Sequence, residues 1–99
     1  MNLKSMDQLI DSWRDEIIEK MRTWIAIPSL KAEASQKNAP FGTDVRHMLD
    51  LFLKDAGEMG FTVDDVDGYA GSAQMGQGEK MMGILAHLDI VPADRKSVV

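Results

Sequence analysis

The segment from Gly83 to Pro92 places the tightest constraint on the fold of this chain. It reads Gly-Ile-Leu-Ala-His-Leu-Asp-Ile-Val-Pro, an apolar run that ends in a histidine and an aspartate before a proline interrupts it. We expect a buried strand over residues 81–88. Because strand side chains alternate with a period of two, His87 and Asp89 should project from the same side at its end.

This arrangement of a histidine and an aspartate is compatible with a metal site. The imidazole can bind a metal through one nitrogen while the carboxylate holds the other, which fixes the tautomer and the orientation of the ring. Spacing alone leaves a second interpretation open, in which His87 is a hydrogen-bonded structural residue. His47 lies off the apolar face of its predicted helix and is expected on the surface.

The composition indicates a folded protein and excludes several classes of partner. With 99 residues, of which 44% are hydrophobic, residues 1–99 are expected to form one small unit. The net charge of −5 argues against nucleic-acid binding, which requires a positive surface. Neither a membrane span nor a signal peptide is evident, so we expect a cytoplasmic protein with no membrane partner. The chain has no cysteine, which leaves histidine and carboxylates as metal ligands.

Two helices are predicted in the first sixty residues. The first spans about residues 6–26, with a capping box at Ser5 and Gln8 and an end before Pro28. The second follows a loop over 29–42, is capped by Thr43 or Asp44 and ends before Gly60. Each carries an apolar stripe expected to pack in the core: Leu9, Trp13, Ile17, Met21 and Trp24 in the first, and Val45, Met48, Leu49, Phe52, Leu53 and Ala56 in the second.

Three strands are predicted after the helices, over residues 61–66, 69–75 and 81–88. Asp67-Gly68 forms the first turn between them, and Gly76 and Gly78 mark the second. The order of two helices followed by about three strands indicates the α/β class. The glycines do not have the spacing of a phosphate-binding loop, and the acids at 64, 65 and 67 do not match a calcium-binding loop.

With these elements in place, the chain resembles the start of a dinuclear zinc exopeptidase of the dipeptidase V, aminoacyl-histidine dipeptidase and carnosinase group. The resemblance covers most of residues 5–93. The central piece of the resemblance is the motif His87-x-Asp89-x-Val91-Pro92. The pieces that favour the dipeptidase branch over the related N-acyl-amino-acid deacylases are Pro40-Phe41-Gly42 and Asp67-Gly68-Tyr69-Ala70-Gly71, and Ile25-Ala26-Ile27-Pro28-Ser29 also matches.

The resemblance implies that these elements are part of a zinc-peptidase catalytic domain, a three-layer sandwich with a phosphorylase/hydrolase-like fold. It implies two zinc ions, with His87 as a ligand of one of them and Asp89 as the residue that orients this histidine. In such enzymes the metals activate a water that hydrolyses a dipeptide, and a downstream glutamate is the general base.

Two features depart from the family pattern. The family's other metal ligands and its general base lie downstream of the motif and are absent here, so the 99 residues alone should bind zinc weakly and be inactive. Residues 94–99 do not continue the pattern and are interpreted as a non-native tail.

Exposed strand edges favour a homo-oligomer, because they can pair with another chain. An alternative from another class is a small protein-interaction module, favoured if His87 is packed inside with its nitrogens bonded to backbone groups. A fragment of a deacylase is the third possibility; it shares the zinc chemistry but acts on N-acyl amino acids.

Overall fold

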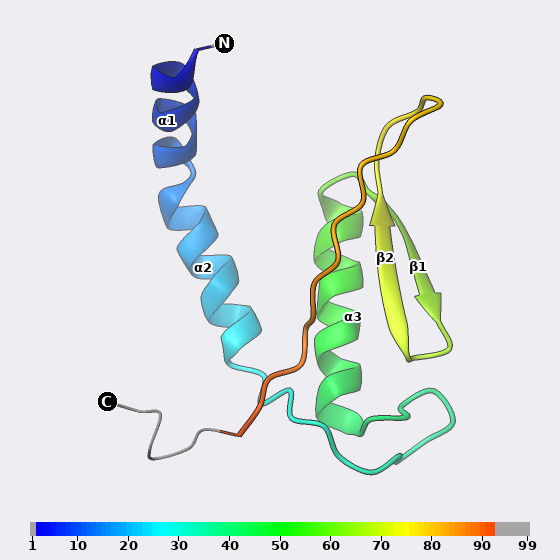
Figure 1. Ribbon diagram of the computed structural model, residues 1–99. Coiled ribbons are helices and arrows are strands. Elements are labelled where there is room, and N and C mark those ends of the chain that lie inside the picture. The colour runs from blue at the N-terminus through cyan, green and yellow to red at the C-terminus, as the bar shows by residue number, and fades with distance from the viewer. Residues whose placement is uncertain (1, 93–99) are drawn as a thin grey trace.

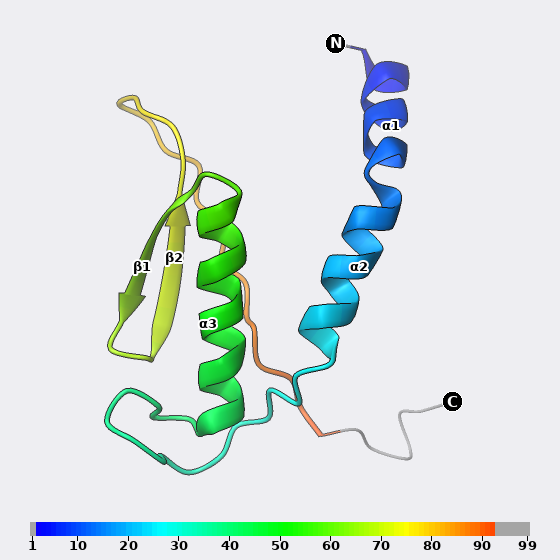
Figure 2. The ribbon, with the colours of Figure 1, turned by 180° about the vertical axis from the view of Figure 1, so that it is seen from behind.

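The structure, a computed structural model, describes residues 2–92. Helix α3 (Thr43–Glu58) packs against a hairpin of two strands, β1 (Thr62–Val66) and β2 (Ala70–Gln74). Two consecutive helices, α1 (Leu3–Ser12) and α2 (Arg14–Ile25), form an arm that diverges from this unit and contacts it through side chains of α2 (Figures 1 and 2). Helices and strands are both present, as the α/β class requires.

Helix α3 confirms the second predicted helix and its apolar stripe. Met48, Leu49 and Ala56 are buried, and the other members of the stripe are half-buried. The helix ends at Glu58 with Met59 as its C-cap, and Gly60 follows with φ of +98°, a conformation that favours glycine. The expected cap is wrong: Gly42 occupies the N-cap position and no side chain caps the helix.

The hairpin confirms the first two predicted strands. The strands pair antiparallel, from Thr62 opposite Gln74 to Val66 opposite Ala70. Asp67 and Gly68 both have positive φ, and the Tyr69 amide donates to the Val66 carbonyl at 2.9 Å, which closes the turn. Helix α3 contacts both strands, so the Leu49 side chain faces the Gly71 backbone.

Arg46 and Asp65 join the hairpin to α3 and to the loop that precedes it. The guanidinium of Arg46 lies 2.6 Å from Asp50 Oδ1 and 2.7 Å from Asp65 Oδ2, and it donates to the Asn38 carbonyl at 3.2 Å. The other Asp65 oxygen accepts the Gly68 amide at 2.8 Å. The Arg46 hydrogen bond, followed by that of Gly68, lowers the pKa of Asp65 from its ordinary value.

The N-terminal arm corrects the prediction of one long core helix. The helix begins at Leu3, because the side chain of Asn2 accepts the Ser5 amide at 2.8 Å, and so Ser5 is not the cap. It breaks at Trp13, where ψ is 2° and the Ser12 hydroxyl donates to the Leu9 carbonyl. Such hydroxyl bonds bend helices. Neither α1 nor α2 buries a residue, so the expected core role of this stripe is wrong for the described residues.

The third predicted strand, over residues 81–88, is also absent from the described part of the chain. After β2 and the turn at Gly76 and Gly78, the chain runs back along α3 to the end of α2 without forming a strand (Figures 1 and 2). A single parallel bridge joins Ile90 to Leu30. A strand requires a neighbouring backbone for its amide and carbonyl groups, and residues 81–88 make no backbone–backbone hydrogen bond here.

The described residues therefore contain a small core and much exposed apolar surface. The buried hydrophobic residues are Ala39, Met48, Leu49 and Ala56. The radius of gyration is 16.4 Å, above the roughly 13 Å of a compact domain of this length. Within residues 2–92, one two-stranded sheet is present, so a three-layer sandwich is not formed by this part alone.

Candidate functional site

His87 and Asp89 lie next to each other on the surface, in the segment that follows the hairpin. Their side chains are 82% and 51% exposed, respectively, and the His87 Nδ1 atom lies 3.7 Å from Asp89 Oδ1. The shorter contact is to the backbone, since His87 Nδ1 lies 2.8 Å from the Asp89 carbonyl oxygen. A carbonyl can only accept, so Nδ1 carries the proton in this contact.

This geometry leaves Nε2 of His87 with a free lone pair directed away from the Asp89 carbonyl contact. Metal-binding histidines have this arrangement, with one ring nitrogen donating to a carbonyl or a carboxylate while the other binds the metal. The expected role of the Asp89 carboxylate is taken in this structure by the carbonyl of the same residue. The carboxylate is close enough to add an electrostatic contribution.

The described residues do not form a complete metal site. Residues 2–92 contain no group of three or more histidines, aspartates or glutamates placed together to hold a metal ion. Zinc sites in proteins use three or four protein ligands. The oriented imidazole of His87 therefore fits zinc as a single ligand, and the other ligands would have to come from outside the described residues.

Ser29 joins the segment that carries His87 and Asp89 to the rest of the fold. Its hydroxyl donates to the Leu88 carbonyl at 3.1 Å, and its carbonyl accepts the Ile90 amide at 3.0 Å. Helix α2 ends just before it, at Ile25, and Pro28 prevents the helix from continuing. Sequence reasoning did not single out Ser29 as a site residue; the only signal was a small polar residue between Pro28 and Leu30.

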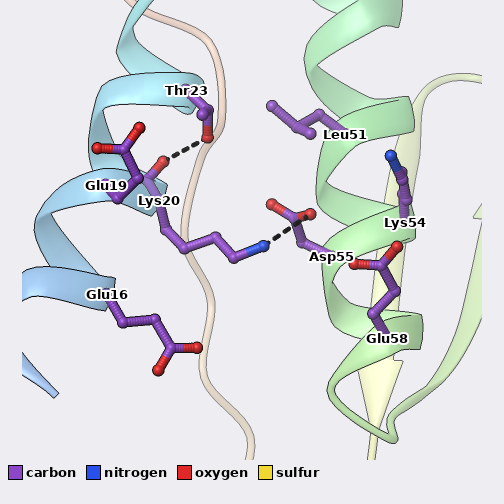
Figure 3. A pocket seen from close by; sticks show the side chains of 8 residues that line it. All are labelled: Glu16, Glu19, Lys20, Thr23, Leu51, Lys54, Asp55 and Glu58. Atoms are coloured by element: carbon purple, nitrogen blue, oxygen red, sulfur yellow. Dashed lines mark hydrogen bonds and ion pairs between the residues drawn. The ribbon is translucent and has the colours of Figure 1, made fainter.

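A second candidate lies between α2 and α3, where charged side chains line an open pocket of about 410 Å³ (Figure 3). Lys20 of α2 reaches Asp55 of α3 at 3.4 Å, and Asp55 also accepts the Trp24 indole N–H at 2.7 Å. Glu16, Glu19 and Glu58 add negative charge around it. Neither His87 nor Asp89 lines this pocket. The Asp55 carboxylate at the centre of this pocket already has two partners, Lys20 and Trp24. We therefore interpret the pocket as part of the contact between α2 and α3.

His47 lies exposed on α3, as predicted. No described helix is long and apolar enough to span a membrane. The interpretation of residues 94–99 as a non-native tail concerns residues outside the described part.

Comparison with known proteins finds sequence similarity to bacterial proteins that are named as dipeptidases. The chain is 38% identical over 85 residues to proteins named "Putative dipeptidase" from Staphylococcus aureus strains USA300, NCTC 8325 / PS 47 and COL. Each match covers 85% of this chain and 18% of the relative, so the chain spans about a fifth of the relatives' length. No protein-family model matches the chain. The similarity supports a dipeptidase-like relationship.

Proposed function

We propose that this chain is the N-terminal part of the catalytic domain of a zinc-dependent dipeptidase. The observation that carries the proposal is the exposed His87 ring, with Nδ1 held by Asp89 and Nε2 free, in a chain similar to proteins named as dipeptidases. The ring has to be exposed if residues from elsewhere in the enzyme are to complete the metal site around it.

In this proposal, each residue of the pair has one task. His87 binds one of two zinc ions through Nε2, and Asp89 keeps the ring in the Nδ1–H tautomer and at the correct angle. When bound, two zinc ions supply a water activated for attack on the peptide carbonyl. The general base and the remaining ligands belong to the rest of the enzyme.

A chimera tests the proposal. Residues 2–92 of this chain replace the corresponding part of the Staphylococcus aureus relative, and hydrolysis of a panel of dipeptides is measured with added zinc. The chimera is expected to hydrolyse dipeptides, and His87→Ala should lower kcat/KM by about 100-fold or more, because losing even a residue that only supports a ligand costs roughly 10–100-fold. The matched control is His47→Ala, which removes the exposed histidine of α3 and should leave the activity unchanged.

Two results would contradict the proposal. One is a folded chimera, by circular dichroism, that hydrolyses no dipeptide of the panel. The other is a His87→Ala chimera as active as His47→Ala. The 99-residue chain by itself should show no turnover, since one ligand is too few for a catalytic zinc site. If this chain alone hydrolyses dipeptides and a chelator abolishes the activity, the proposal that the rest of the enzyme supplies the other ligands and the general base is wrong.

The same assay separates the two alternatives. A deacylase would release the amino acid from N-acetyl amino acids in preference to dipeptides. The interaction module required a buried His87 bonded to backbone groups; Nδ1 does bond to a carbonyl, but the ring is exposed. That exposure favours the metal-ligand proposal.

A further inference from the structure

We propose that Ser29 is a positioning residue for the His87–Asp89 pair, because it fixes both peptide groups that flank Asp89. The inference deepens the proposed function and rests on it for the role of the pair. The contacts themselves are a property of this chain and can be tested without metal or substrate.

Ser29 binds the segment on both sides of Asp89. Its hydroxyl donates to the carbonyl of Leu88, which belongs to the peptide group before Asp89. Its carbonyl accepts from the amide of Ile90, which belongs to the peptide group after Asp89. Ser29 and Leu88 are 59 residues apart in sequence, so this is a tertiary contact.

The second of these peptide groups is the one that His87 uses. A peptide group is planar, with its carbonyl and its amide directed to opposite sides. The Asp89–Ile90 peptide donates from its amide to Ser29 at 3.0 Å, and its carbonyl lies 2.8 Å from His87 Nδ1. Ser29 and the imidazole therefore hold the two ends of one rigid plane. Rotation of that plane would move the acceptor away from the ring.

Within the described residues, the hydrogen bonds that hold this segment are those to Ser29, at the place where Ile90 forms a bridge with the neighbouring Leu30. From Met75 to Pro92, the bonds that reach the rest of the described chain are the two to Ser29. Packing does not replace them, because every side chain from Met81 to His87 is exposed and Leu88 is half-buried. The position of the pair therefore depends on Ser29 more than on any other described residue.

Ser29 itself is held firmly enough for this task. It is 1% exposed, and its amide donates to the Ile27 carbonyl at 2.8 Å. All three of its polar groups thus have partners, in agreement with the rule that buried polar groups are hydrogen-bonded. A serine that only stabilises the fold would be equally buried and equally well bonded. The test must therefore report on the His87 ring.

The test is the tautomer of His87 in the 99-residue chain, measured from the ring nitrogen chemical shifts at pH 8.5, where an ordinary histidine is neutral. In the unaltered chain, His87 should be mainly the Nδ1–H form, whereas a free imidazole favours Nε2–H. Ser29→Ala should lower the ratio of the Nδ1–H to the Nε2–H form at least about two-fold, as expected when a hydrogen bond is weakened. His47 should show no change and is the internal control.

Two further variants complete the experiment. Ser35→Ala removes another loop hydroxyl, which is bonded to Thr43 at 3.0 Å, and should leave the His87 ratio unchanged. Ser29→Thr keeps the hydroxyl and should restore the ratio. If Ser29→Ala does not fold, Ser29→Cys carries the same comparison, because a thiol has nearly the same shape and is a weaker donor.

One result overturns the inference: a folded Ser29 variant that melts at a lower temperature but keeps the His87 ratio of the unaltered chain. Ser29 would then be structural only. This outcome is independent of the chimera assay, since an inactive chimera contradicts the dipeptidase function and leaves the tautomer measurement valid. Conversely, an active chimera with an unchanged His87 ratio in Ser29→Ala contradicts only the positioning role.

Discussion

At the scale of single residues, Asp55 connects the N-terminal arm to the main unit. It is buried, and its carboxylate accepts the Trp24 indole N–H at 2.7 Å and lies 3.4 Å from Lys20. The Trp24 hydrogen bond is the main cause that holds the pKa of Asp55 below its ordinary value of 3.8; Lys20 adds to the effect and burial opposes it. The Lys20 side chain is partly exposed, so its ion pair is the weaker contact.

The lowered pKa of Asp55 predicts acid sensitivity of the contact between α2 and α3. The unfolded chain binds a proton at the ordinary value, and the folded chain binds it only at lower pH. The stabilisation is therefore complete above about pH 4 and is lost as the pH falls through the lowered value. In a Trp13→Phe background, Trp24 is the only indole, and its fluorescence should report this loss.

Asp55→Asn should remove that acid transition and cost about 1 kcal/mol of unfolding free energy at pH 7, because a bond to a charged acceptor becomes a neutral one. The matched control is Asp11→Asn on the exposed face of α1, which should keep the transition. A Trp24 signal that responds to acid identically in Asp55→Asn and in the Asp11→Asn control would refute this role of Asp55.

At the scale of elements, the close approach of the hairpin turn to the loop before α3 depends on one glycine. Gly68 is buried with φ of +79°, and a Cβ atom there would overlap the carbonyl oxygen of Asn38. Phe41 and Tyr69 meet edge to face beside it, with ring centroids 5.5 Å apart. The backbone at Gly68 therefore has two requirements, a positive φ and the absence of a side chain.

A pair of glycine substitutions separates these two requirements. Gly76 also has a positive φ, of +89°, but open space surrounds the position of its Cβ. Gly76→Ala should cost about 1–2 kcal/mol, from backbone strain alone. Gly68→Ala should cost about 1–3 kcal/mol more, from the clash with Asn38. Urea denaturation followed by circular dichroism measures both, and equal losses would show that the turn does not need this contact.

At the scale of the whole molecule, the largest apolar surfaces are uncovered. Ile84 and Leu85 in the extended segment are exposed almost completely, and the apolar stripe of α1 and α2 is exposed within residues 2–92 except at Trp24, which meets Phe52 of α3. Extended backbone without a neighbouring strand is a template for pairing with another chain. The prediction of a homo-oligomer through such edges is untested by this structure and remains a prediction.

Light scattering at micromolar concentration should give a mass of a dimer or larger. A lysine in the unpaired segment should oppose pairing, because charges on an edge prevent its association. Leu85→Lys is therefore expected to shift the mass toward the monomer, and Gln77→Lys in the preceding turn is the matched control with the same added charge. A monomeric mass for the unaltered chain would contradict the prediction.

Features that depend on residues close together in sequence could be predicted from the sequence. Features that depend on residues far apart in sequence could not. The stripe of α3 and the Asp67-Gly68 turn follow from local periodicity and local backbone preferences, and both are present. The core packing of the first helical stripe and the third strand were predicted wrongly, because an apolar pattern shows that a segment needs a partner but not whether the chain supplies one. Only the tertiary structure brought Ser29 to the peptide groups beside Asp89, since that contact joins residues 59 positions apart and no local pattern encodes it.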